Sequence, residues 1–232
     1  MPLLLAFDTA TPHLAVVLSD GARPVAWRID PGPKPSHAEK INVYIGEVLA
    51  EAGKTMGALE AVAVGTGPGS YTGLRIGLSA AKGLAFALDR PLIGMGTLEV
   101  LLAEALGHAA PDARAVYWPM VDARRMEVYT RPYMADGQPL GATAPLVLDE
   151  AWCEARRAGG GAVVVFGDGA DKAAALWQAH PWITHLGGIH PGAGGLARCA
   201  GRYFREGRFS NLAHLVPAYG KPANVAQQRG KE

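Results

Sequence analysis

The sequence predicts an α/β protein with two lobes, and two observations carry this prediction. The first half of the chain has the pattern of three antiparallel strands, a helix, a strand, a helix and a strand. The second half repeats the beginning of this pattern in degraded form. We therefore expect one lobe in residues 1–106 and a second in residues 107–216. Residues 217–232 are polar and contain proline, which favours a strap that ends as a loose tail.

The first lobe is expected to begin with a three-stranded meander. Residues 2–7 and 13–18 are continuous apolar runs, which predict two buried strands of a hairpin. Asp20 and Gly21 form a strong tight-turn signal, so residues 24–29 follow as a third strand of the same sheet.

A helix is expected to follow the meander. Ser36 and Glu39 have the spacing of a capping box. In this motif the Ser36 hydroxyl accepts from the backbone N–H of Glu39, and the Glu39 carboxylate accepts from the backbone N–H of Ser36. Gly53 supplies the stop. The apolar side chains between them recur at helical spacing, and they are Ile41, Tyr44, Ile45, Val48, Leu49 and Ala52.

A glycine-rich stretch, GTGPGSYTGLRIGLSAAKGLA, lies between an expected strand at 60–64 and an expected helix at 72–88, with a further strand at 91–95. A Walker-type phosphate loop needs Lys and then Ser or Thr after its last glycine, but Leu74 follows Gly73 here. The dinucleotide fingerprint fails as well, because Ser or Thr stands where its third glycine belongs. We favour a tight structural turn over phosphate binding, with Ser70 or Thr72 capping the helix. The residues of this structural motif are Gly67, Gly69, Ser70 and Thr72.

The second half is expected to contain strands at 115–121 and 126–133 around a charged turn. Asp122, Arg124 and Arg125 in this turn could contact a partner molecule, or could simply be paired locally, and we favour local pairing. The remaining expected elements are helices at 150–158, 170–178 and 196–204 and a buried strand at 163–166.

Composition limits the classes of function. The 22 Lys and Arg residues against 21 Asp and Glu residues leave a formal charge of +1. This balance lacks the excess of basic residues that a protein needs to bind nucleic acid without a partner. Cys153 and Cys199 have no CxxC neighbour, which favours a reducing compartment. No signal-like opening and no run of about 18 apolar residues occurs, so we expect a cytoplasmic protein without membrane contact.

Three motifs, in order along nearly the whole chain, resemble those of the bacterial TsaB family, also called YeaZ: FDTATPHLAVVLSDG, GTGPGSYTGLRIGLSAAKGLA and VDARRMEVY. The resemblance implies the actin-like/Hsp70/sugar-kinase (ASKHA) fold, with two RNase-H-like lobes of which the second is degraded. It also implies a non-catalytic partner of the transferase TsaD. With the ATPase TsaE, that pair would place a threonylcarbamoyl group on N6 of adenosine 37 (t6A) in tRNAs that read ANN codons.

The resemblance further implies how the complex is assembled. The chain would form a heterodimer with TsaD through the first two helices of its first lobe, and a homodimer when alone. It would contact tRNA only indirectly, through the complex. No intrinsic cofactor is implied, and ATP or ADP would bind only at the interface of the complex.

The helix at 72–88 carries an unusual stripe of small residues. Glycine inside a helix costs about 1 kcal/mol relative to alanine, so its presence favours close approach of another element. That element is either a helix of a partner or a neighbour within the lobe, and both alternatives stay open. On the partner interpretation, Gly77→Leu weakens partner binding and leaves the chain folded. The candidate interface residues are Tyr44, Val48, Tyr71, Gly73, Gly77, Ala80 and Leu84.

Asp8, Thr9 and Thr11 lie where kinases and ATPases of this fold place their first phosphate hairpin. The turn lacks the glycine that would admit a phosphate and has no Lys or Arg. We interpret it as a vestigial nucleotide hairpin, or as an Asp that accepts turn N–H groups. An ATP-dependent small-molecule kinase of the same fold is the alternative function.

A metal-dependent peptidase is the weakest alternative. The catalytic paralogue uses an HxxxH pair on one helix face, whereas here Ile41 follows four residues after His37. His180, His185 and His190 are spaced five apart in a Gly- and Pro-rich region. We expect exposed histidines there and no metal ligands.

Overall fold

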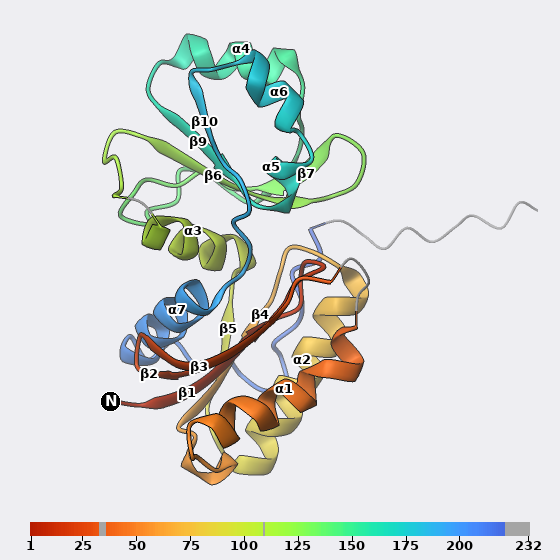
Figure 1. Ribbon diagram of the computed structural model, residues 1–232, viewed down its shortest axis with the longest axis vertical. Coiled ribbons are helices and arrows are strands. Elements are labelled where there is room, and N and C mark those ends of the chain that lie inside the picture. The colour runs from red at the N-terminus through yellow and green to blue at the C-terminus, as the bar shows by residue number, and fades with distance from the viewer. Residues whose placement is uncertain (33–35, 109, 221–232) are drawn as a thin grey trace, which may run out of the picture.

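Two separate sheets organise the computed structural model, which describes residues 1–32, 36–108 and 110–220. Each sheet has five strands, and the two lobes are stacked along the long axis of the molecule (Figure 1). Residues 221–232, expected as the end of a loose tail, lie outside the described residues. Among those described, no helix is long and apolar enough to cross a membrane.

The first sheet begins with the expected meander. Its strands are β1 (Leu3–Asp8), β2 (Leu14–Asp20), β3 (Arg23–Asp30), β4 (Ala61–Gly65) and β5 (Leu92–Met95). Their order is β3-β2-β1-β4-β5, with β2 antiparallel to its two neighbours and β4 parallel to β1 and β5. Strands β1 and β4 are buried on both faces, which explains why they read as continuous apolar runs.

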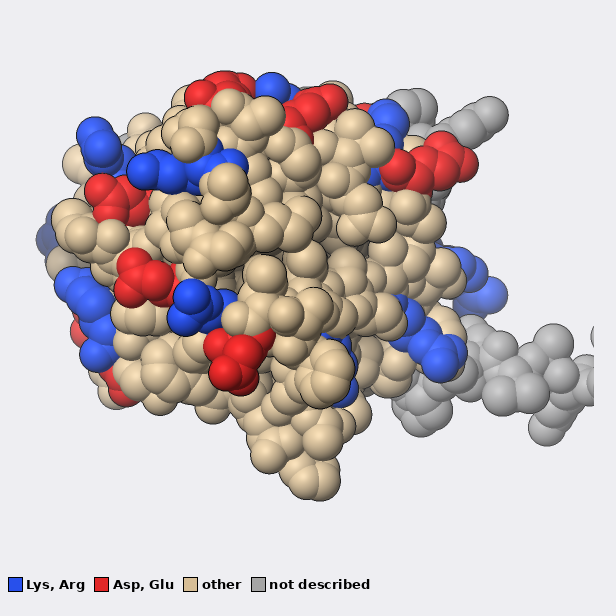
Figure 2. Space-filling view, turned by 90° about the horizontal axis from the view of Figure 1, so that it is seen from below, with Lys and Arg blue, Asp and Glu red and all other residues tan. Residues whose placement is uncertain are grey.

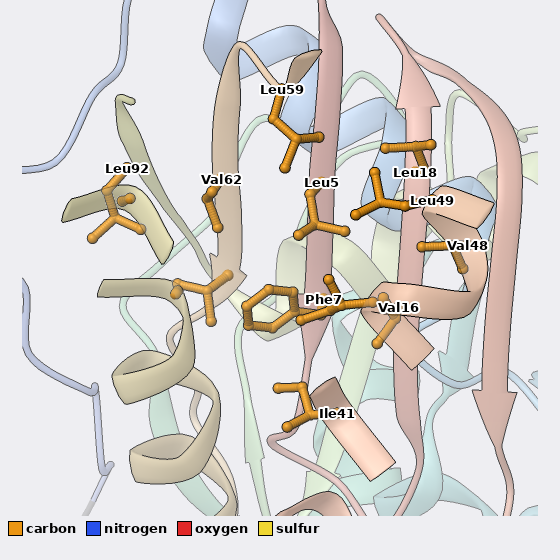
Figure 3. Packing of buried hydrophobic residues seen from close by; sticks show 14 of the residues in the cluster. Leu5, Phe7, Val16, Leu18, Ile41, Val48, Leu49, Leu59, Val62 and Leu92 are labelled. Atoms are coloured by element: carbon orange, nitrogen blue, oxygen red, sulfur yellow. The ribbon is translucent and has the colours of Figure 1, made fainter. Parts of the chain in front are cut away.

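Helices cover both faces of this sheet. On one face lie α1 (His37–Glu51) and α2 (Tyr71–Leu88), and a short 3₁₀ turn, η1 (Met56–Ala58), follows α1. Apolar side chains of α1 meet those of the sheet in one cluster, where Ile41 and Val48 approach Phe7 and Val16 (Figure 3). This burial removes apolar surface from water and so stabilises the lobe.

Helix α7 (Ala193–Arg205) covers the opposite face of the first sheet. Its Leu196, Cys199 and Tyr203 share a buried cluster with Leu4 and Val17. The expected second lobe at 107–216 is therefore wrong at its C-terminal end, because the chain returns to the first lobe. The sequence showed a helix here but not which sheet would bury it.

The second sheet repeats the topology of the first. Its strands are β6 (Val116–Asp122), β7 (Glu127–Thr130), β8 (Ala144–Val147), β9 (Val163–Phe166) and β10 (Ile183–Leu186). Their order is β10-β9-β6-β7-β8, with β6, β7 and β8 antiparallel and β9 parallel to β6 and β10. The predicted repeat is thus confirmed. Strands β8 and β10 were missed because both are short sheet edges without clear alternation.

The second lobe carries α4 (Glu150–Gly159), α5 (Asp168–Asp171) and α6 (Ala174–Ala179). The single helix expected at 170–178 is instead two short helices. The break is held by Trp177, whose indole N–H donates to the carbonyl oxygen of Ala170 at 2.8 Å. That bond occupies a carbonyl near the end of α5 and seats the indole in the core.

Helix α3 (Thr97–His108), which the sequence analysis missed, lies between the lobes (Figure 1). Leu98, Leu101 and Leu102 pack into the core of the second lobe, while Val100 packs with α7. A helix that buries residues on several sides has no clear amphipathic period, which explains the omission.

The helix ends test the predicted capping signals. Ser70 accepts from the Gly73 N–H at 3.2 Å and caps α2, so the prediction of a cap is confirmed with Ser70 and not Thr72. Gly53 ends α1 in the left-handed region, with φ of +60°, as predicted. The capping box at Ser36 is wrong, because its hydroxyl donates to Asp30 Oδ2 at 2.6 Å. This charge-assisted bond fixes the Ser36 side chain on Asp30, at the end of β3, and the hydroxyl accepts no bond from the first turn of α1.

Candidate functional site

The turn after β1 uses the carboxylate of Asp8 for internal bonds. Asp8 is fully buried, its Oδ1 accepts from the Ala10 N–H at 2.7 Å and its Oδ2 accepts from the Thr97 hydroxyl at 2.8 Å. Burial raises the pKa of Asp8 to about 6, against the two hydrogen bonds that lower it. This geometry is that of an Asp accepting turn hydrogen bonds. Thr9 and Thr11 are buried beside it.

The glycine-rich motif packs against this same turn. A Cβ atom built on Gly73 would overlap the Thr9 carbonyl oxygen, and one on Gly77 would overlap the Thr9 hydroxyl. A Cβ atom on Gly65 would overlap the side chain of Asp8, and one on Gly69 would overlap the carbonyl oxygen of Ala10. Four glycines at intervals of four residues therefore let one segment approach the turn closely. Of the two alternatives for the small stripe, packing within the lobe holds.

This packing corrects part of the candidate interface. Gly73 and Gly77 are buried against Thr9, and Val48 is fully buried in the core, so none of the three is accessible to a partner. The expectation that Gly77→Leu leaves the chain folded is therefore wrong. Tyr44, Ala80 and Leu84 are half-buried and pack against the core, and Tyr71 is 46% exposed.

The exposed sides of α1 and α2 carry different residues, which sequence reasoning missed. Val43 is 54% exposed and Phe86 is 77% exposed. A Cβ atom built on Gly46 or Gly83 would meet nothing within 4 Å, so packing within the chain requires neither glycine. We call these residues, with Ala50 and Ala87, the outer face of α1 and α2. Their i, i+3 and i, i+4 spacing is visible in the sequence, but only burial separates them from the core stripe.

The charged turn between β6 and β7 is paired locally through its aspartate. Asp122 Oδ1 accepts from the Arg124 N–H at 2.7 Å and from the ammonium of Lys172. Arg124 and Arg125 have φ of 72° and 52°, an uncommon conformation for residues with a Cβ atom. Both side chains are exposed, and neither guanidinium forms an ion pair with another described residue. The structure thus supports local pairing for Asp122 and leaves the two guanidinium groups accessible.

A cavity of about 350 Å³ lies between the lobes, under the C-terminal strap. The Ala218 N–H donates to the Thr66 carbonyl oxygen at 2.8 Å, and Tyr219 stacks on Tyr71 with ring centroids 4.7 Å apart. The cavity is lined by Thr66, Gly67, Pro68, Gly96, Leu98, Glu99, Arg131, Tyr133, Thr143, Ala218 and Gly220. Both charged groups of the lining already have partners. Glu99 is engaged by Arg202 at 3.2 Å and by the Tyr203 hydroxyl, and Arg131 donates from Nε to the Gly141 carbonyl oxygen at 2.6 Å and lies over the Tyr133 ring.

The histidines have separate partners. His180, His185 and His190 are half-buried, so the expectation that they are exposed is wrong. His37 Nε2 donates to the Thr11 carbonyl oxygen at 2.9 Å, and the residue is buried. His180 contacts Glu150 at 2.6 Å, His185 contacts Asp171 at 2.9 Å, and His190 stacks on another histidine. In the described part of the chain, no three His, Cys, Asp or Glu residues are grouped so that they could hold a metal.

Comparison with known proteins now gives the family. A family model described as TsaD, tRNA N6-adenosine threonylcarbamoyltransferase, matches residues 33–163. A protein of Escherichia coli (strain K12), named tRNA threonylcarbamoyladenosine biosynthesis protein TsaB, is 30% identical over 243 residues, which cover 99% of each chain. The chain belongs to the TsaB family.

Solved structures agree with membership of the TsaB family. YeaZ from Pseudomonas aeruginosa superposes with a TM-score of 0.74 and 26% identity, over 94% of this chain and 100% of that one. The ROK hexokinase from Thermus thermophilus superposes with a TM-score of 0.51 and 16% identity, over 88% and 99%. The hexokinase shows the fold alone, and it confirms the actin-like/Hsp70/sugar-kinase architecture expected from the motifs.

Proposed function

We propose that the chain acts in tRNA threonylcarbamoyladenosine biosynthesis as the non-catalytic partner of a TsaD-type transferase. With a TsaE-type ATPase, this pair would modify N6 of adenosine 37 in tRNAs that read ANN codons. The single observation that carries the proposal is the match to E. coli TsaB along 99% of both chains. The match of residues 33–163 to the transferase family model supports a common ancestry with the catalytic partner.

The turn after β1 supports a non-catalytic role. Both carboxylate oxygens of Asp8 are used by Ala10 and Thr97, and the side chain is fully buried. A Mg-nucleotide placed at this turn would find no free carboxylate for its metal ion and no basic side chain of the turn for its phosphates. This favours the partner role over the alternative of an ATP-dependent small-molecule kinase. Nucleotide would then bind only where the two proteins meet.

The outer face of α1 and α2 supports a docking surface for the transferase. Phe86 exposes 77% of its surface, and Gly83 and Gly46 leave open space in which another helix could approach. The same face would form the homodimer when the chain is alone. Seen from the end that carries the first lobe, Lys and Arg lie among Asp and Glu around a broad uncharged surface (Figure 2). That distribution favours contact with tRNA through the complex.

Light scattering on the chain mixed with the transferase paralogue of the same organism tests the proposal. We expect a defined heterodimer, and Phe86→Asp should weaken it about tenfold or more, because a buried aromatic anchor would become a buried charge. Val147→Asp is the matched control, since Val147 on β8 is 54% exposed and lies outside the outer face. Separate proteins under all nucleotide conditions would contradict the proposal.

Calorimetry with Mg-ATP on the chain alone distinguishes the kinase alternative. The partner role predicts no binding heat from the isolated chain, and nucleotide binding only after the transferase is added. Saturable binding to the isolated chain that Asp8→Asn abolishes would favour the kinase instead.

A further inference from the structure

His13 and His190 join the two lobes through a stacked pair of rings. Their ring centroids are 3.6 Å apart and the ring planes differ by 17°. His13 belongs to the turn between β1 and β2 in the first lobe. His190 lies between β10 and α7, in the segment that descends from the second lobe to the first (Figure 1). We call residues 187–192 the crossing. The stack therefore holds the crossing against the turn between β1 and β2 of the first lobe.

Neither ring has a hydrogen bond that would favour its charged form. The Nδ1 atoms of both histidines are buried and have no partner among the described residues. Burial lowers the pKa of both rings, and His190 lowers that of His13 further. The neutral forms are therefore the ones that fit this stack.

Two carboxylates face the pair, and each is already engaged. Asp30 on β3 raises the pKa of His13, but its carboxylate accepts from Lys40 Nζ at 2.7 Å. Asp171 on α5 raises the pKa of both rings, but it pairs with His185 at 2.9 Å. These neighbours only partly offset the desolvation of the rings, which is the larger effect in each case.

The crossing itself has the features of a hinge. Gly187 and Gly188 precede His190, and Gly188 has φ of +73° with no atom within 4 Å of a Cβ built on it. Pro191 and Gly192 follow it and lead into α7, which is fixed on the first sheet. Other contacts also hold this segment, because Ile189 is buried in the second-lobe cluster and the Gly188 N–H donates to the Asp171 carboxylate at 3.3 Å. The exposed Gly187 and Gly188 are the positions at which the backbone angles can change.

We propose that the His13–His190 stack is a proton-operated clasp between the lobes. While both rings are neutral, they stack and hold the crossing against the turn after β1. When both carry a proton, two like charges face each other at stacking distance in a partly buried site, and their repulsion separates them. The crossing is then released, and the lobes open along the face that contains this turn.

Amide hydrogen exchange on the full chain at about pH 7.5 and about pH 4 tests the clasp. The acid value lies well below the usual histidine pKa of about 6.5 because burial lowers the pKa of both rings. We expect the protection factors of two amides on either side of the stack, corrected for intrinsic exchange, to fall about tenfold at the acid pH. These are the Ser70 N–H, which donates to the Ala10 carbonyl oxygen at 2.7 Å, and the Leu196 N–H, which donates to the Gly192 carbonyl oxygen at 3.0 Å. Titration of the ring protons by NMR shows whether each histidine has become charged.

His190→Phe separates the clasp from other acid effects. Phenylalanine keeps a flat ring and cannot be charged, so this variant should retain its protection at about pH 4. Asp8 and Asp168, whose pKa burial raises to about 6, are unchanged in it and act as internal controls. His214→Gln, at an exposed histidine, should lose protection as the wild type does. His13→Phe is the reciprocal variant if His190→Phe does not fold.

Two results would overturn the clasp. One is equal loss of protection in the wild type and the Phe variants. The other is unchanged protection in the wild type when NMR shows both rings protonated.

Discussion

The Thr9 hydroxyl donates to the carbonyl oxygen of Gly73 at 2.8 Å, which ties the turn after β1 to the first helical turn of α2. Both residues are buried, and the bond joins positions 64 residues apart in the chain. The turn that was interpreted from the sequence as a vestigial nucleotide hairpin is closed by the protein's own helix. The glycines of α2 make this closure sterically possible.

Gly77→Ala should destabilise the isolated chain by about 2 kcal/mol or more, because its Cβ atom would overlap the Thr9 hydroxyl. Gly83→Ala is the matched control in the same helix. It meets nothing within 4 Å and should stabilise the chain by about 0.5–1 kcal/mol. Urea unfolding of the two variants measures the difference, and equal midpoints would refute the packing role of Gly77.

Asp8→Asn should flatten the pH dependence of stability between about pH 4 and pH 6. Burial raises the pKa of Asp8 to about 6, so the folded chain keeps a proton that the unfolded chain releases near the usual aspartate pKa of 3.8. The contribution of Asp8 to stability is therefore highest in acid and falls as the pH rises through that window. Above the window, the buried and ionised carboxylate destabilises the fold by up to about 3 kcal/mol.

An amide at position 8 would retain both hydrogen bonds, accepting from Ala10 and donating to Thr97. Unfolding free energies of the wild type and Asp8→Asn across the window measure the slope. Since Asp168 titrates in the same range, only the difference between the two proteins is diagnostic. Parallel profiles would show that Asp8 does not titrate there.

Ser70→Ala should cost about 1 kcal/mol of stability, because the Gly73 N–H loses its cap. Thr72→Ala, at an exposed position in the first turn of the same helix, should change stability by less than about 0.5 kcal/mol. Thermal melts of both variants measure the two losses. A larger loss at Thr72 would show that Thr72, and not Ser70, caps the helix.

Arg124→Gly should stabilise the chain by up to about 1 kcal/mol, because glycine adopts a positive φ without the Cβ penalty. Chemical denaturation measures the free energy of unfolding of this variant, and Lys54→Gly, at an exposed lysine beyond α1, is the control. If the turn only connects strands, tRNA modification by the reconstituted complex stays unchanged. Loss of modification by a more stable variant would assign the guanidinium to tRNA or to the ATPase.

Local pattern was sufficient for the elements whose environment is simple. The meander of β1 to β3 followed from two apolar runs and the turn at Gly21, and α1 followed from helical spacing up to Gly53. Helix α3 was missed because it is buried between both lobes and α7, which removes the alternation that marks a surface helix.

By itself, the sequence determined the repeated order of strands and helices, the TsaB motifs and the stripe of small residues on α2. Only the tertiary structure decided what that stripe contacts, because Gly73 and Gly77 meet a turn more than 60 residues away in the chain. It also decided that Val48 lies in the core, that Ser36 bonds to Asp30, and that His13 meets His190. These contacts join residues distant in the chain, and local propensity carries no information about which distant surfaces will be buried together.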